Sequence, residues 1–147
     1  MIGLDTNVLV RHLTGDDPAQ SPVARDLLAG RTAADPAFIS LVTLVEAVWT
    51  LSSRRYGYDR AALLYVVGDL AGLDEVRFQE HAAVVAAVAL SRQTGCDFPD
   101  ALVAELGARA GCFHTATFDQ QAASLVPEMR IVPSQAANTK GSGDGVG

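Results

Sequence analysis

Residues 2–9 read IGLDTNVL, a stretch that predicts a short strand, a tight turn and the start of a helix. The apolar run is only three residues long and ends at Asp5. After the turn, Val8, Leu9 and Leu13 follow at a spacing typical of a helix rather than of a strand. A strand that leads directly into a helix is the repeating unit of α/β proteins, and here an acidic residue stands at the junction.

The same alternation of short strands and helices continues along the chain. It predicts an α/β fold with three layers, α/β/α, in which a central, mostly parallel, short-stranded sheet lies between helices joined by right-handed crossovers. Asp16, Asp17 and Pro18 are a typical helix start, and Gly30 is a typical helix end. The predicted helices are 16–30, 41–55, 59–70, 80–94, 98–110 and 119–125, and the further strands are 36–40, 74–78, 113–116 and 129–132.

Length and composition favour one globular domain. The chain has 147 residues, of which 49% are hydrophobic and 19% charged. We expect residues 1–133 to form the domain and residues 134–147, rich in Gly and Ser, to be a disordered tail. The N-terminus has no secretory signal, and the longest apolar run, Ala82–Leu90, is about half of the ~18 residues that a membrane span needs. These features predict a cytoplasmic protein with no membrane partner, whose Cys96 and Cys112 are reduced core thiols.

The charge is acidic and unevenly distributed. Eleven basic and seventeen acidic residues give a net charge of −6, which by itself disfavours binding to nucleic acid. The only lysine is Lys140, so the predicted domain has none. Chemistry that needs a lysine on phosphates or a lysine Schiff base is therefore disfavoured.

Acidic residues recur where predicted strands give way to helices, or on the helices beside these points. The set is Asp5, Glu46, Asp97, Asp100 and Asp119. The carboxyl ends of parallel strands lie along one edge of a sheet, where ligands bind, so we expect Asp5 and Asp119 at that edge. Each Asp could instead cap a helix, and Glu46 could belong to an ordinary solvated face. Crowded carboxylates repel one another unless a cation joins them, and Mg²⁺ or Mn²⁺ prefers oxygen ligands of this kind.

The order of these motifs resembles that of the PIN-domain ribonucleases. DTN follows the first strand at Asp5, TLVE carries Glu46, DFPDAL carries Asp97 and Asp100, and TFD ends at Asp119. Among these ribonucleases the chain is most similar to the toxin subunits of bacterial virulence-associated, VapC-type, type II toxin–antitoxin modules. The resemblance covers residues 1 to about 133.

The resemblance implies roles for particular residues. Asp5, Glu46, Asp100 and Asp119 correspond to the catalytic, metal-binding quartet, which holds Mg²⁺ or Mn²⁺. The supporting positions are Asp97 as an accessory acid, Asn7 beside Asp5, and Thr117 before the last acid. The family also implies an RNA substrate cut by a metal-activated water, a homodimer, and a cognate antitoxin that covers the acidic groove.

Other residues have more open roles. Arg11, Arg54, Arg55 and Arg60 are candidates for contact with RNA phosphates, and Arg11 is preferred because it follows Asp5 on the same predicted helix. Trp49, Tyr56 and Tyr58 are predicted to anchor the core or an interface rather than to stack on bases. His12, His81 and His114 have no clustered spacing and are expected to be structural. The helix from Leu63 to Leu70 could contact a partner or pack inside the molecule.

Two other functions fit part of the pattern. A catalytically silent PIN-like module could bind RNA or protein, although it would have no need of four repelling acids. A phosphotransferase of the haloacid dehalogenase type also begins with a strand and an Asp. It would need an acid where Asn7 stands and a core lysine that the sequence lacks.

Overall fold

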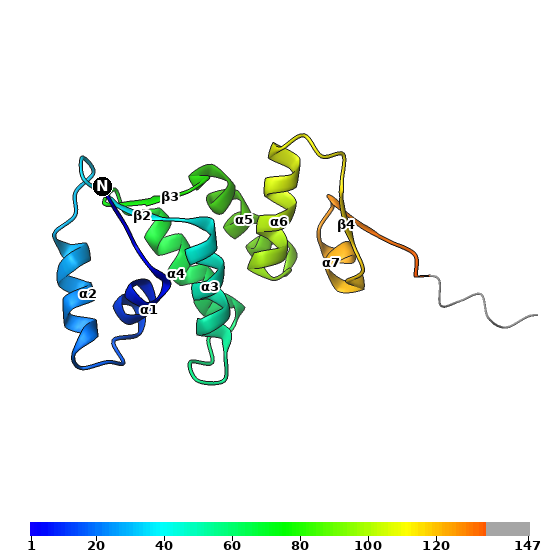
Figure 1. Ribbon diagram of the computed structural model, residues 1–147. Helices are drawn as coiled ribbons and strands as arrows, with labels where there is room; N and C mark the ends of the chain where they lie inside the picture. The colour runs from blue at the N-terminus through cyan, green and yellow to red at the C-terminus, as the bar shows by residue number, and fades with distance from the viewer. Residues whose placement is uncertain (135–147) are drawn as a thin grey trace, which may run out of the picture.

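The computed structural model describes residues 1–134, and the last thirteen residues, 135–147, lie outside it. The predicted tail therefore falls almost entirely outside the described residues. The elements, in chain order, are β1 (Ile2–Gly3), α1 (Thr6–Thr14), α2 (Gln20–Ala29), β2 (Ala37–Ile39), α3 (Leu41–Ser52), α4 (Arg60–Ala71), β3 (Val76–Phe78), α5 (His81–Thr94), α6 (Phe98–Arg109), β4 (Thr115–Thr117), α7 (Gln120–Leu125) and β5 (Met129–Ile131) (Figure 1).

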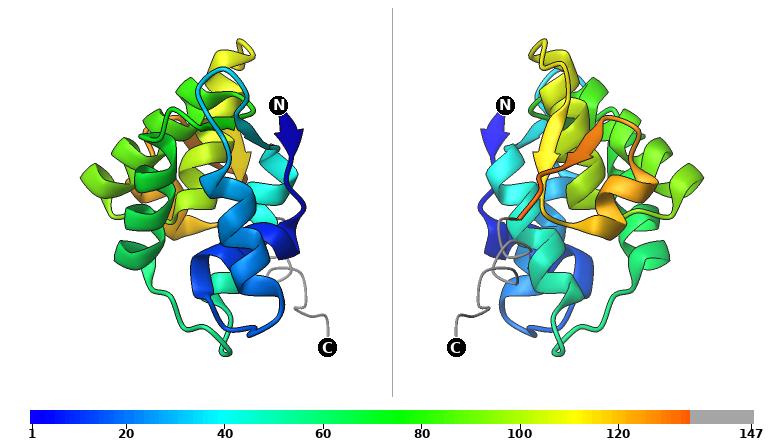
Figure 2. Two further views of the ribbon diagram at one scale, coloured as in Figure 1. Left: turned by 90° about the vertical axis from the view of Figure 1, so that its left-hand side faces the viewer. Right: turned by 90° about the vertical axis from the view of Figure 1, so that its right-hand side faces the viewer.

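The strands are short and all their pairings are parallel, which confirms the α/β class. They form two sheets, one of order β1-β2-β3 and one of β4-β5. Within residues 1–134, β1 and β4 do not pair with each other, so the strands do not form one continuous central sheet. Figures 1 and 2 place β1, α1 and α2 at one end of the molecule and β4, α7 and β5 at the opposite end. Asp5 and Asp119 therefore follow strands of different sheets.

Local sequence explains where the helices begin. The Ser40 hydroxyl accepts a hydrogen bond from the Thr43 amide at the start of α3, at 3.1 Å. Asp59 does the same for Ala62 at the start of α4, at 2.8 Å. Helix α1 ends at Gly15, whose φ of 65° lies in the left-handed region that glycine adopts without strain. These caps fix the start of α3, which is the helix that carries Glu46, the start of α4 and the end of α1.

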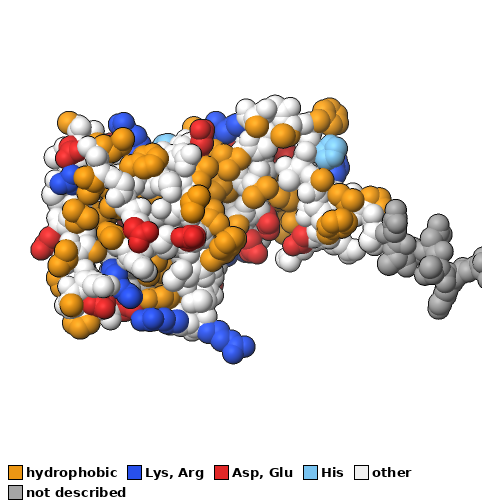
Figure 3. Space-filling model, viewed as in Figure 1, with side chains coloured by type: hydrophobic (Ala, Val, Ile, Leu, Met, Phe, Trp, Pro, Cys, Tyr) orange, Lys and Arg blue, Asp and Glu red, His pale blue; other side chains and the backbone are white. Residues whose placement is uncertain are grey.

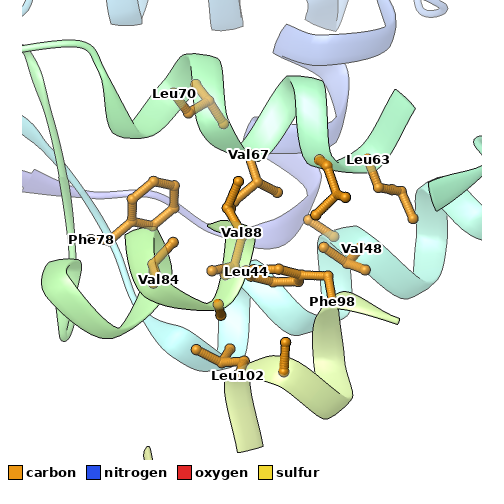
Figure 4. Packing of buried hydrophobic residues seen from close by; sticks show 14 of the residues in the cluster. Leu44, Val48, Leu63, Val67, Leu70, Phe78, Val84, Val88, Phe98 and Leu102 are labelled. Atoms are coloured by element: carbon orange, nitrogen blue, oxygen red, sulfur yellow. The ribbon is translucent and has the colours of Figure 1, made fainter. Parts of the chain in front are cut away.

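The core lies between the first sheet and helices α3 to α6. Figure 4 shows Leu44 and Val48 of α3, Val67 of α4, Val84 of α5 and Phe98 of α6 packed together. The apolar residues of α4 at positions 63, 64, 67 and 70 are all buried in this cluster. The internal packing predicted for the helix from Leu63 to Leu70 is thereby confirmed, while contact with a partner through the exposed side of this helix, where Tyr65 lies, stays a prediction.

Three expectations about side chains are corrected by the structure. Cys96 is buried as predicted, but Cys112 is exposed, because it lies in the loop after α6 rather than in the core. Trp49 is 63% exposed, so of the two predicted roles the core anchor is wrong, and the interface anchor stays a prediction. Phe113 is fully exposed, and the strand predicted from it begins two residues later, where Thr115 pairs with Met129. Within residues 1–134, no helix is long and apolar enough to cross a membrane.

Candidate metal and nucleic-acid site

Asp5 stands at the N-cap position of α1 but does not cap it. Its φ and ψ are −79° and 156°, the extended conformation usual at an N-cap, yet its side chain makes no capping hydrogen bond. The residue is exposed. The capping interpretation therefore fails for Asp5, whose carboxylate is left available to a ligand.

Glu46 lies in the middle of α3 and is connected to the residue after Asp5. The Thr6 hydroxyl donates a hydrogen bond to Oε2 of Glu46, with a donor–acceptor distance of 2.6 Å. The start of α3 is also joined to the end of the first strand segment, because the Thr43 hydroxyl donates to the Leu4 carbonyl at 3.2 Å. These two bonds hold the Glu46 helix against the turn that carries Asp5.

A second acidic group lies where α6 meets α7. Asp97, Asp100 and Asp119 line a hollow of about 20 Å³ together with Gln121, which is room for about one water-sized ligand. Asp100 is half-buried. Its burial raises the pKa of its carboxyl group above the ordinary value, and the negative charges of Asp119 and Asp97 raise it further. The three acids thus repel one another in a site that a cation would stabilise.

Of the two other acids in this group, Asp119 caps a helix with its side chain and Asp97 does not. Asp97 occupies the N-cap position of α6 without making a capping bond. Asp119 does cap α7, because its Oδ1 accepts a hydrogen bond from the Ala122 amide at 2.9 Å. The amide of Asp119 in turn donates to the Thr117 hydroxyl at 3.0 Å, so Thr117 supports the turn that holds this acid.

The two acidic groups do not converge into one metal site. In the part of the chain that the structure describes, no three His, Cys, Asp or Glu side chains stand close enough together to hold a metal ion. Figure 3 shows acidic side chains both toward α1 and toward α6 on one face, with a band of hydrophobic side chains over α3 between them. The structure therefore brings Glu46 to the neighbour of Asp5, and Asp100 to Asp97 and Asp119, as two separate groups.

Arg11 and Asn7 lie on a different surface from the acids. Both line a groove of about 350 Å³ between α1 and α2. The Arg11 guanidinium donates to both carboxylate oxygens of Asp16, at 2.9 and 3.1 Å, and to Gln20 at 3.0 Å. The Asp16 hydrogen bond raises the pKa of Arg11. Contact of Arg11 with an RNA phosphate, and support of Asp5 by Asn7, stay predictions; Arg11 would have to give up these partners to make such a contact.

Sequence reasoning overlooked Thr6 and did not predict that Trp49 is exposed. Thr6 stands inside the DTN motif, but only its bond to Glu46, forty residues away, gives it a role. Trp49 is three residues after Glu46, which places both on one face of α3. That spacing was visible in the sequence; the exposure of the ring was not.

The family model of the PIN domain matches residues 2–126. No curated protein matches the chain.

Proposed function

The chain belongs to the PIN domain family, a nuclease-type fold, and we propose that it is a Mg²⁺- or Mn²⁺-dependent endoribonuclease. One observation carries the proposal: the half-buried Asp100 lines a small hollow together with two further carboxylates, Asp97 and Asp119, and burial, followed by their charges, raises its pKa. Like charges are gathered at a hollow only where something compensates them, and a divalent cation is the natural partner of such a group.

The donor chemistry of the acidic residues suits a hard divalent ion. Every candidate ligand is a carboxylate, and Mg²⁺ and Mn²⁺ prefer oxygen donors while keeping several waters. We assign Asp100 and Asp119, with Asp97 beside them, to one acidic group at α6, and Asp5 and Glu46 to a second acidic group near α1. A bound ion of this kind supplies Lewis acidity and a water of lowered pKa that can attack a phosphodiester.

The residues of the chain itself have separate tasks in this proposal. Thr6 orients the Glu46 carboxylate through its 2.6 Å hydrogen bond. Thr117 fixes the turn of Asp119, whose Oδ1 is occupied at the start of α7 and whose Oδ2 has no hydrogen-bond partner among residues 1–134. Asp100 lies within the first turn of α6, and burial followed by the charges of Asp119 and Asp97 raises its pKa, so a bound cation would favour its ionised form.

The biological setting is proposed from the motifs. DTN, TLVE, DFPDAL and TFD in this order support a VapC-type toxin subunit that acts as a homodimer in the cytoplasm. A cognate antitoxin would neutralise it by covering the acidic groove. With an acidic protein, a basic segment of that antitoxin is the chemistry expected to meet the carboxylates.

The proposal is tested by cleavage of total RNA. The parent protein is incubated with RNA in Mg²⁺, in Mn²⁺ and in EDTA, beside Asp5→Asn and Asp100→Asn variants. Asp69→Asn, an exposed acid on α4, is the matched control. We expect discrete cleavage by the parent and the control only when metal is present. Equal cleavage by all variants would exclude the proposed site, and the lack of cleavage together with metal-independent RNA binding would favour a silent binding module.

A further inference from the structure

A second hollow lies beside the acids, between α3, the start of α4 and the start of α6. Its volume is about 310 Å³, at the lower end of the range of small-molecule sites, roughly 300–1,000 Å³. The side chains that could make specific contacts there are Trp49, Ser52, Tyr58, Arg60, Asp97 and Pro99. The lining thus combines aromatic rings, hydroxyl groups and a cation, whereas no aromatic ring lines the groove between α1 and α2.

Trp49 lines this hollow and is also exposed to solvent. It is the only tryptophan of the chain, and its exposed fraction is 63%. A large ring that is not used in the core, and that borders a cavity, is the arrangement on which a planar ligand stacks.

Arg60 supplies a positive charge at the same hollow. One of its NH groups donates to the Gly95 carbonyl at 2.6 Å, which holds the guanidinium at the rim. Among residues 1–134, no carboxylate forms an ion pair with Arg60, whereas Arg11 is paired with Asp16. In a protein of net charge −6, an arginine without a carboxylate partner beside a cavity is suited to bind a phosphate.

The position of the hollow connects the two acidic groups. Trp49 shares a face of α3 with Glu46, one helical turn away. Asp97 borders both this hollow and the small hollow that holds Asp100 and Asp119. The hollow therefore borders Asp97 of one acidic group and lies one helical turn from Glu46 of the other.

We infer that this hollow binds one unpaired nucleobase of the RNA substrate, stacked on Trp49, with Arg60 against an adjoining phosphate. The inference rests on the proposed nuclease function and adds a substrate class to it. A base inside a duplex is stacked on its neighbours and cannot reach a side pocket, so the hollow selects single-stranded or looped RNA. The Tyr58 hydroxyl is available to the polar edge of the base, and the Ser52 hydroxyl, which donates to the Val48 carbonyl, can still accept a hydrogen bond from it.

The single tryptophan makes the contact directly measurable. In an Asp119→Asn background with Mg²⁺, where the RNA is bound without being cut, Trp49 fluorescence is recorded while an unpaired RNA octamer is added. Stacking on the ring is expected to quench the emission, and a blunt duplex of the same sequence is expected to leave it unchanged. The measurement does not depend on turnover, so it separates this inference from the proposed catalytic activity.

Variants of Trp49 and Arg60 then measure how much each side chain contributes to RNA affinity. With a fluorescent RNA octamer as the probe, Trp49→Ala is expected to bind roughly 5- to 100-fold more weakly, and Trp49→Phe to retain most of the affinity. Tyr65→Ala, which removes a ring 70% exposed on α4 and outside the hollow, is the matched control. Arg60→Gln is expected to lower the salt slope of binding by about 0.7, the value for one phosphate contact on a single strand, and Arg77→Gln to leave it unchanged.

Specific results would overturn the inference. One is RNA cleavage that requires Asp100 while octamer binding leaves Trp49 fluorescence unchanged: the nuclease would stand and the base site would not. Another is that Trp49→Ala changes the sedimentation of the protein but not its RNA affinity, since the ring would then be a contact between copies of the chain. Loss of cleavage in every preparation, with quenching retained, would instead contradict the proposed function alone.

Discussion

The Thr6 hydroxyl donates a 2.6 Å hydrogen bond to the Glu46 carboxylate, joining the residue after Asp5 to the middle of α3. The bond therefore joins the DTN motif, which carries Asp5, to the TLVE motif, which carries Glu46. Because an orienting hydrogen bond fixes which way a ligand oxygen points, Thr6 is expected to influence metal binding without touching the metal itself.

Replacing Thr6 tests this role. Thr6→Val removes the donor at nearly constant volume, and we expect the Mg²⁺ concentration for half-maximal RNA cleavage to rise about 10-fold, as for outer-sphere partners of metal ligands. Thr6→Ser should restore it. Thr50→Val is the matched control, because the Thr50 hydroxyl bonds to the backbone carbonyl of Glu46 at 2.8 Å and not to its carboxylate. An equal effect of Thr50→Val would attribute the loss to the helix rather than to the carboxylate.

The burial of Asp100, together with the repulsion from Asp119 and Asp97, predicts a gain in stability when its charge is removed. Its pKa is raised in the folded protein, so the folded state holds the proton more tightly than the unfolded state does. The free energy of unfolding therefore falls as pH rises from the unfolded pKa, near 3.9, through the higher folded pKa, and stays lowered above it. Without metal at neutral pH, Asp100→Asn is expected to be more stable than the parent, by at most about 1 kcal/mol after solvent screening.

The measurement is thermal or urea unfolding at several pH values. The difference between Asp100→Asn and the parent should vanish below the unfolded pKa and should reverse when Mg²⁺ is added, since only the parent gains binding energy. Asp69→Asn, again the exposed control on α4, should show neither change. If the parent were the more stable protein in EDTA at pH 7, the proposed repulsion would be absent.

Asp16 predicts an acid-sensitive contact far from the metal site. Hydrogen bonds from the hydroxyl groups of Thr14 and Tyr56, and then the Arg11 guanidinium, hold the pKa of Asp16 well below its usual range. Stability from this cluster is fully present above the unfolded pKa, near 3.9, and is lost as pH falls toward the lower folded value. Asp16→Asn should thus melt below the parent at pH 7, and the gap should close in strong acid. A gap independent of pH would assign the effect to packing.

Two neighbouring residues of α3 test the position of the core. Leu44 is 1% exposed and Val42 is 69% exposed. Leu44→Ala is expected to lower the free energy of unfolding by about 2–5 kcal/mol, since it opens a cavity among helices α3 to α6. Val42→Ala should change it by less than about 0.5 kcal/mol. Urea denaturation measures both, and comparable losses would mean that α3 is rotated about its axis.

Local features of the fold were predictable from sequence, because local chemistry decides them. Strand 36–40 contains β2, and the helix predicted over 80–94 is α5 apart from its first residue. The helix predicted over 41–55 ends earlier, at Ser52. The Ser52 and Ser53 hydroxyls donate to the backbone carbonyls of Val48 and Thr50, and such side-chain bonds compete with continuation of the helix.

Relationships between distant segments could not be predicted in the same way. The sequence places an acid after β1 and another after β4, but whether these strands are neighbours depends on pairings that no local pattern encodes. The division into two sheets decides that Asp5 and Asp119 do not share a sheet edge. Likewise, the exposure of Trp49 depends on what packs over α3, and a tryptophan is more often buried.

Asp119 combines two tasks in one side chain, and this limits how it can be replaced. Its Oδ1 begins α7, a helix of six residues that has little else to hold its first turn. An alanine at this position would remove the charge and the helix start together, so inactivity would have no single cause. Asparagine caps a helix about as well as aspartate. A neutral residue that retains the cap therefore separates the electrostatic role of Asp119 from its part in starting α7.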